Sequence, residues 1–216
     1  TILALVMHLA GLAGIFFGMQ DIFEKLTPFN LVVMLLLILY TMPEKNARVL
    51  AFFMLAFLIG LFTEMAGVHT GVLFGNYTYG NAMGLKLNGV PLLIGINWCI
   101  VVYASGMLAM YIRNLLARHF LPSGRAAFSR WFGISTVLDG ALIATLFDWI
   151  MEPAAIKLGF WKWEGGHIPP LNYLTWFLVS LLLLALFRVF RLKYHPFAVN
   201  LLIIQALFFA LVSLMG

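Results

Sequence analysis

The sequence predicts an all-α protein, a polytopic membrane bundle of about seven transmembrane helices with two aromatic-rich outer loops. Of its 216 residues, 63% are hydrophobic and 10% are charged, and the mean hydropathy is +1.02. Soluble domains carry about 25% charged residues, so this composition excludes a water-soluble fold. At about 20 residues per span, the length suits one membrane domain over residues 1–216.

Apolar runs, interrupted by charged residues or by Gly, Pro and Asn, define the individual helices. The runs predict spans near residues 1–19, 28–42, 48–68, 89–112, 131–152, 171–189 and 196–215. The second span is short, and every later orientation would invert if it did not cross the membrane.

Basic residues are distributed unequally between alternate loops. One set of loops holds nine Lys and Arg residues and the other holds four. Because cytoplasmic loops are enriched in Lys and Arg, we expect a cytoplasmic amino terminus and an external carboxyl terminus in the cell membrane. The net charge of +5 then reflects topology, and no nucleic-acid partner is predicted.

Two long loops lie on the predicted outer side, at residues 71–88 and 153–170. Both are rich in aromatic residues, Gly and Asn. Polar backbone at membrane depth is tolerated where it is buried in protein or lines a cavity. We therefore expect re-entrant or capping loops.

Three carboxyl groups are predicted to meet in the outer half of the membrane. Glu64 lies late in the third span, and Asp148 and Glu152 lie late in the fifth. The latter two are four residues apart and share a helix face, where repulsion and burial favour a proton on at least one of them. Such a pair is a source of a general acid, although interfacial carboxyls satisfied by backbone and water are the alternative.

Several polar residues are weaker candidates. Asp139 is a secondary candidate that points to the opposite helix face from the carboxyl pair. His69, Asn97 and Asn172 could position a water, or could have structural roles. The remaining histidines are scattered, so no metal site is predicted.

Aromatic and amide side chains flank the carboxyl groups. They either anchor the protein at the membrane interface or form the walls of a cavity for a long apolar ligand, where π faces could stabilise a carbocation. The candidate substrate-binding residues are Asn76, Tyr77, Tyr79, Trp98, Trp161 and Trp163.

Two further classes are excluded by single residue types. The last span contains no lysine, which excludes a retinal protein with its Schiff base in that helix. The single cysteine, Cys99, excludes an intramolecular disulfide and a cysteine-ligated zinc cluster.

A series of short motifs between about Leu61 and Trp176 resembles the carotenoid biosynthesis membrane-protein family. This family includes cofactor-independent carotenoid 1,2-hydratases and bisanhydrobacterioruberin hydratases. The motifs are EMAGVHTG at 64–71, FGNYTY at 74–79, GVP at 89–91, NW at 97–98, DWIMEP at 148–153, GFWKW at 159–163 and PLNY at 170–173.

The resemblance implies addition of water across the terminal C1–C2 double bond of an acyclic carotenoid, without a cofactor. Asp148 or Glu152 would donate the proton, Glu64 would act as partner or orient the water, and aromatic walls such as Trp98, Trp161 and Tyr79 would stabilise the cation. The implied partners are an acyclic carotenoid, membrane lipid and other carotenoid-pathway enzymes.

Two rival functions remain open at this point. A membrane lycopene-type cyclase would use the same acid but capture the cation with an internal double bond. A carotenoid-binding or transport protein would perform no chemistry, and no internal repeat typical of transporters is visible.

Overall fold

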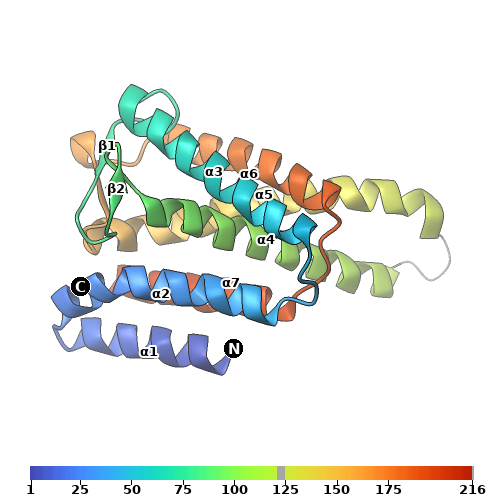
Figure 1. The fold of residues 1–216 in the computed structure, drawn as a ribbon, viewed down its shortest axis with the longest axis horizontal. Helices are drawn as coiled ribbons and strands as arrows, with labels where there is room; N and C mark the ends of the chain where they lie inside the picture. Colours follow the sequence, from blue (N-terminus) through green and yellow to red (C-terminus); the bar gives the residue numbers. More distant parts are fainter. Residues whose placement is uncertain (121–124, 216) are drawn as a thin grey trace.

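The computed structural model describes residues 1–120 and 125–215 and confirms an all-α bundle (Figure 1). The helices in this part of the chain are α1 (Ile2–Phe16), α2 (Gln20–Thr41), α3 (Ala47–Thr70), α4 (Leu92–Phe120), α5 (Arg125–Lys157), α6 (Pro170–Val189) and α7 (Pro196–Leu214).

Five helices are long and apolar enough to cross a membrane: α3, α4, α6, α7 and the part of α5 from Gly133 onward. The helix α1 and the apolar part of α2, Lys25–Thr41, are shorter. Each predicted span thus corresponds to a helix. With 15 residues, α1 falls below the usual spanning length of about 20 residues, whereas the whole of α2 has 22. The side chains of Arg125 and Arg130, two of the nine basic residues counted above, lie outside the described part.

Several helix boundaries differ from the predicted ones; α4 continues to Phe120 rather than ending near 112, and α5 begins at Arg125 rather than near 131. The first helix ends at Phe16 because Gly18 adopts a left-handed φ of 76° and reverses the chain. The second begins at Gln20 and continues through Pro28, where the prediction placed its start. The fifth continues through Pro153, so the following loop begins later than predicted. Proline removes one helix hydrogen bond but is tolerated here inside both helices.

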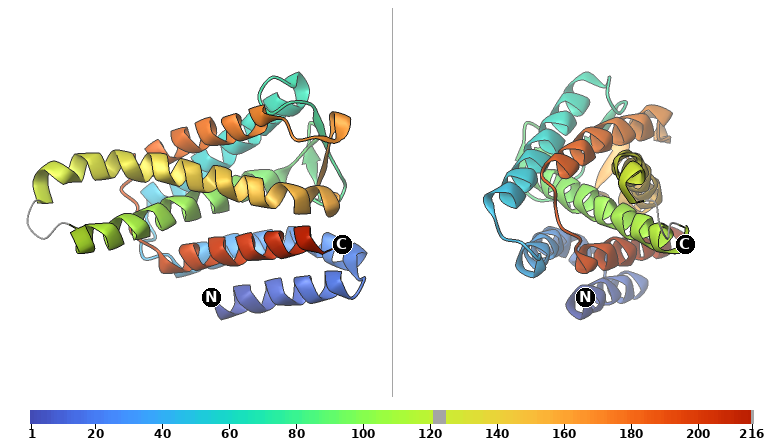
Figure 2. Two further views of the ribbon diagram at one scale, coloured as in Figure 1. Left: turned by 180° about the vertical axis from the view of Figure 1, so that it is seen from behind. Right: turned by 90° about the vertical axis from the view of Figure 1, so that its right-hand side faces the viewer.

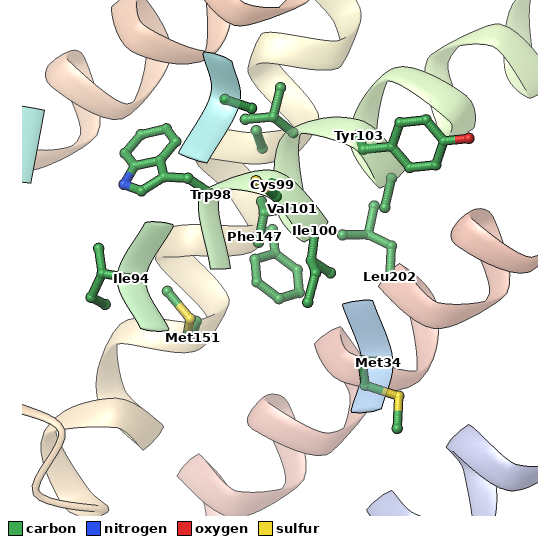
Figure 3. Packing of buried hydrophobic residues seen from close by; sticks show 14 of the residues in the cluster. Met34, Ile94, Trp98, Cys99, Ile100, Val101, Tyr103, Phe147, Met151 and Leu202 are labelled. Carbon is green, nitrogen blue, oxygen red and sulfur yellow. The ribbon is translucent and has the colours of Figure 1, made fainter. Parts of the chain in front are cut away.

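The helix α4 occupies the centre of the bundle. It packs against α2, α3, α5, α6 and α7, and Figure 3 shows its residues Cys99 and Ile100 among Phe147 of α5, Leu202 of α7 and Met34 of α2. The helix α1 lies at the edge and packs mainly on α2 and α7 (Figures 1 and 2). A helix that is apolar on all sides is expected to be buried, and the sequence of α4 is apolar on all sides.

Short strands form where the sequence predicted two capping loops. Strand β1 (Tyr77–Tyr79) pairs antiparallel with β4 (Trp161–Trp163), which leads into a 3₁₀ turn at Glu164–Gly166. Strands β2 (Lys86–Leu87) and β3 (Val90–Pro91) form a separate hairpin. We call the β1–β4 pair the aromatic ribbon; it joins the α3–α4 and α5–α6 connections at one end of the bundle (Figure 1).

The two ends of the bundle differ in charge. The α2–α3 and α6–α7 connections, with the basic residues Lys45, Arg191 and Lys193, lie at the end opposite the aromatic ribbon, as does Arg48 in the first turn of α3 (Figure 2). This arrangement matches the predicted alternation of loops, and the direction of insertion stays a prediction.

Cysteine labelling tests that direction. The native Cys99 is buried, so a cysteine introduced at Thr78 on the aromatic ribbon or at Lys193 on the opposite end supplies the accessible thiol. A membrane-impermeant maleimide should label Thr78→Cys in intact cells and Lys193→Cys after lysis, because the basic end faces the cytoplasm. The reverse pattern would show the opposite insertion.

Candidate active site

The three predicted carboxyl groups converge beneath the aromatic ribbon. Glu64 of α3 and Asp148 and Glu152 of α5 are 4%, 0% and 2% exposed, and all three line one small cavity. Among the described residues, no lysine or arginine lines this cavity. Three buried carboxyl groups without a cation cannot all be ionised at low cost, so a proton is shared among them.

Three aromatic side chains donate hydrogen bonds to Glu64. The hydroxyls of Tyr77 and Tyr79 lie 2.5 Å and 2.7 Å from its Oε2 atom, and Nε1 of Trp98 lies 3.0 Å from its Oε1 atom. Burial, followed by the nearby charge of Glu64, raises the phenol pKa of Tyr77 and Tyr79. Both phenols therefore keep their protons and act as donors.

Glu152 accepts hydrogen bonds from two indoles and one amide. The Nε1 atoms of Trp161 and Trp163 each lie 2.9 Å from its Oε2 atom. The Nδ2 atom of Asn172 lies 3.2 Å from Oε1 of Glu152 and 2.8 Å from Oδ2 of Asp148, so it bridges the two carboxyl groups. Because an indole can donate but not accept, this arrangement suits an ionised Glu152.

Asp148 differs from the other two carboxyl groups. Its Oδ1 atom is buried and has no hydrogen-bond partner in the described part of the chain. A buried carboxyl oxygen without a donor is better satisfied as a protonated O–H than as an anion. The arrangement favours Asp148 as the carboxyl group that holds the shared proton, and Asp148 lines the carboxyl cavity.

The alternation of side chains along the ribbon explains how four aromatic donors meet two carboxylates. Tyr77 pairs with Trp163 and Tyr79 pairs with Trp161 across the strands, with ring centroids 4.9 Å and 6.0 Å apart. Since successive strand residues point to opposite faces, all four rings lie on the buried face. The tyrosines donate to Glu64 and the tryptophans to Glu152.

Close helix packing holds the third indole in place. The side chain of Trp98 in α4 packs directly on Gly60 of α3. A Cβ atom at position 60 would lie 2.5 Å from the Cβ and Cγ atoms of Trp98, so only glycine fits there. The ring of Trp98 stacks on Trp176 of α6, with centroids 3.9 Å apart and 16° between the planes. Trp98 is fully buried and does not line the cavity, so it holds Glu64 rather than forming a wall.

The carboxyl cavity adjoins a larger apolar one. The carboxyl cavity has a volume of about 20 Å³, which is room for about one water. The apolar cavity measures about 270 Å³ and is lined by residues of α1, α2, α4, α5 and α7 and of the outer loops. Asn97, Met151 and Trp161 line both cavities, so the two cavities are direct neighbours.

Besides Trp98, three predicted site residues line neither cavity. Asp139 is exposed, because nine residues of helix rotate it to the face opposite Asp148. His69 is also exposed, and its Nδ1 atom lies 2.7 Å from the carbonyl oxygen of Met65. Asn76 is exposed in the turn before β1. The structure gives none of them a place beside a ligand in these cavities.

Four residues that line the carboxyl cavity were not predicted as site residues from the sequence. They are Phe74, Ile94, Met151 and Trp176. Apolar residues in an apolar sequence give no signal of their own. The alternating Tyr-Thr-Tyr and Trp-Lys-Trp triplets have the period of two that is typical of strands, but three residues are too short a run to predict one. Among the described residues, no group of three or more His, Cys, Asp or Glu side chains has a metal-binding arrangement.

Comparisons with known proteins place this chain in a family. Residues 27–215 match the family model described as "Carotenoid biosynthesis protein". A bisanhydrobacterioruberin hydratase from Haloarcula japonica is 31% identical over 128 residues, which cover 57% of this chain and 39% of that protein. The chain therefore matches well under half the length of this relative, and no solved structure matches it significantly. With most of its length matched by the family model, the chain belongs to the carotenoid biosynthesis protein family.

Proposed function

We propose that this protein hydrates the terminal C1–C2 double bond of an acyclic carotenoid by acid catalysis through a tertiary carbocation. The observation that carries the proposal is the buried carboxyl group of Asp148, whose Oδ1 atom has no partner among the described residues in a cavity with room for about one water. The name of the Haloarcula japonica relative supports the same reaction.

Asp148 acts as the proton donor in this mechanism. Glu64 and Glu152 are each held as acceptors by three donors, whereas Oδ1 of Asp148 is free to carry and release a proton. The O–H bond breaks and a C–H bond forms at the less substituted alkene carbon, using the π electron pair. The positive charge is then left on the tertiary carbon, which is the more stable of the two cations.

A water molecule completes the reaction. Its oxygen forms the C–O bond to the cation, and the proton it loses returns to the carboxylate of Asp148, directly or through Glu152. The sum is one water added, with no change in oxidation state. Asn97 lines both cavities and is positioned to orient this water, and the rings of Trp161 and Trp176 border the reacting carbon.

The apolar cavity supplies the place for the substrate chain. A carotenoid end group with its double bond at Asp148 would extend past Met151 and Trp161 into the space between α1, α2, α5 and α7. This environment excludes bulk water, which would otherwise capture the cation at random or weaken the acid.

Carotenoid analysis in a lycopene-producing bacterial host tests the proposal. The wild-type chain should yield a product heavier by one water, detected by chromatography with mass spectrometry. Asp148→Asn should lower its formation by about 100-fold or more, because loss of a general acid typically costs 10²–10⁴-fold.

Asp139→Asn is the matched control for this experiment, since it removes an exposed carboxyl group from the same helix. It should leave product formation unchanged. Full hydration by Asp148→Asn would rule out the assigned donor. A product of unchanged mass would instead identify a cyclase, and bound pigment without a product would identify a binding protein.

Removal of the phenolic donors tests the role of the ribbon. The double variant Tyr77→Phe with Tyr79→Phe leaves Glu64 with Trp98 as its remaining donor. Hydrogen bonds to charged groups contribute about 1.5–3 kcal/mol each, so we expect at least a tenfold loss of hydration rate. Tyr111→Phe, at an exposed ring of α4, is the control. Equal rates for both variants in membranes with equal protein levels would contradict this role.

A further inference from the structure

The large apolar cavity contains a polar region that the proposed hydration does not use. Most of its lining is aliphatic or aromatic, but His8 of α1, Asn30 of α2 and Gln205 of α7 also line it. A buried polar group without a hydrogen bond costs about 1–3 kcal/mol. Thr27 and Asn97 line it as well, so polar side chains from four different helices meet in one apolar cavity, which favours a ligand with a polar group.

The two amides are incompletely satisfied. Gln205 is 4% exposed, and its Oε1 atom has no hydrogen-bond partner in the described part of the chain. The Oδ1 atom of Asn30 is likewise buried and without a partner there. Each amide thus offers an acceptor to whatever occupies the cavity.

His8 offers an acceptor beside Gln205. Its Nδ1 atom lies 2.7 Å from the carbonyl oxygen of Ala4 and must carry the proton of that hydrogen bond, so Nε2 holds a lone pair. The ring of His8 also meets the ring of Phe208 edge-on at 5.5 Å. Phe208 follows Gln205 by one helical turn, which brings His8 and Gln205 to the same part of the cavity.

We propose that His8, Asn30 and Gln205 form a subsite for a hydroxyl group on the isoprenoid chain, set back from the end that reacts. A hydroxyl can donate to one of these acceptors and accept from an amide N–H, whereas a carboxylate or phosphate would meet acceptors and no cation. The inference rests on the proposed function because it takes this cavity as the place of the substrate chain.

The subsite would make the protein selective for hydroxylated substrates. A site that hydrogen-bonds a substrate hydroxyl discriminates against the analogue without it, because its buried polar groups are then left unpaired. His8 lies outside residues 27–215, the part of the chain that the family model matches. This selectivity therefore depends in part on a helix that lies before the matched segment.

A series of linear terpenes tests the subsite by binding. Linalool, nerolidol and geranyllinalool share the same terminal trisubstituted double bond and place a tertiary hydroxyl at increasing distances from it. Myrcene, β-farnesene and β-springene are hydrocarbons of matching chain length. Dissociation constants are measured by tryptophan fluorescence of the purified full chain in lipid nanodiscs, since Trp161 lines the cavity.

At least one alcohol should bind about tenfold more tightly than its hydrocarbon, as expected for one net hydrogen bond. Gln205→Leu and Asn30→Leu should each reduce this preference to less than about threefold. Phe209→Leu, which changes an apolar residue of the same cavity, should leave it unchanged. The ratio of the hydrocarbon's dissociation constant to the alcohol's is compared between variants. The different partitioning of the two ligands into lipid is the same for every variant and cancels in this comparison.

Equal preference in the wild type and the two leucine variants would overturn the subsite, as would equal binding of every alcohol and its hydrocarbon. Loss of all binding in a variant that still unfolds cooperatively at the wild-type temperature would also contradict it, because the hydrocarbon needs no polar group. The experiment measures binding, so its result does not depend on whether the protein hydrates a carotenoid. A chain that prefers alcohols but forms no hydrated carotenoid would refute the proposed function and leave the subsite intact.

Discussion

The structure depends on how three carboxyl groups are buried inside the helix bundle with no lysine or arginine lining their cavity in the described part of the chain. Neutral donors satisfy two of these groups: two phenols and one indole for Glu64, and two indoles and one amide for Glu152. Each donor must approach its carboxyl group from a fixed direction. The paired strands, the close approach of Trp98 to Gly60 and the position of Asn172 in the first turn of α6 provide these directions. The aromatic residues here act chiefly through their N–H and O–H groups, and their rings fill the space between those groups.

Much of this arrangement can be predicted from the sequence. Apolar runs locate the helices, and the cost of exposing a carboxyl group to lipid favours the interior for Glu64, Asp148 and Glu152, although Asp139 in the same run as Asp148 is exposed. The spacing of four residues between Asp148 and Glu152 places them on one face, and the spacing of nine excludes Asp139 from it. The alternation of basic loops also matches the two ends of the bundle.

Other features depend on contacts between distant segments and could not be predicted in this way. The pairing of residues 77–79 with 161–163 has no local signal strong enough to override the expectation of a loop. Asn76 and His69 carry side chains suited to a site, but a turn and a helix end direct them outward. Pro28 and Pro153 show the same limit, because tertiary packing keeps a helix continuous where a proline favours a break.

The position of the ribbon strands along the chain has a consequence for biosynthesis. Glu64 enters the membrane with α3, whereas two of the four ribbon rings emerge after α5, and Asn172 emerges later still. Until then Glu152 and Asp148 lack their donors in an apolar environment. Until α6 has been made, protonation of these carboxyl groups lowers the cost of an apolar environment. The carboxyl cluster is complete once α6 packs beside α3 and α5, and this helix is made after the other two.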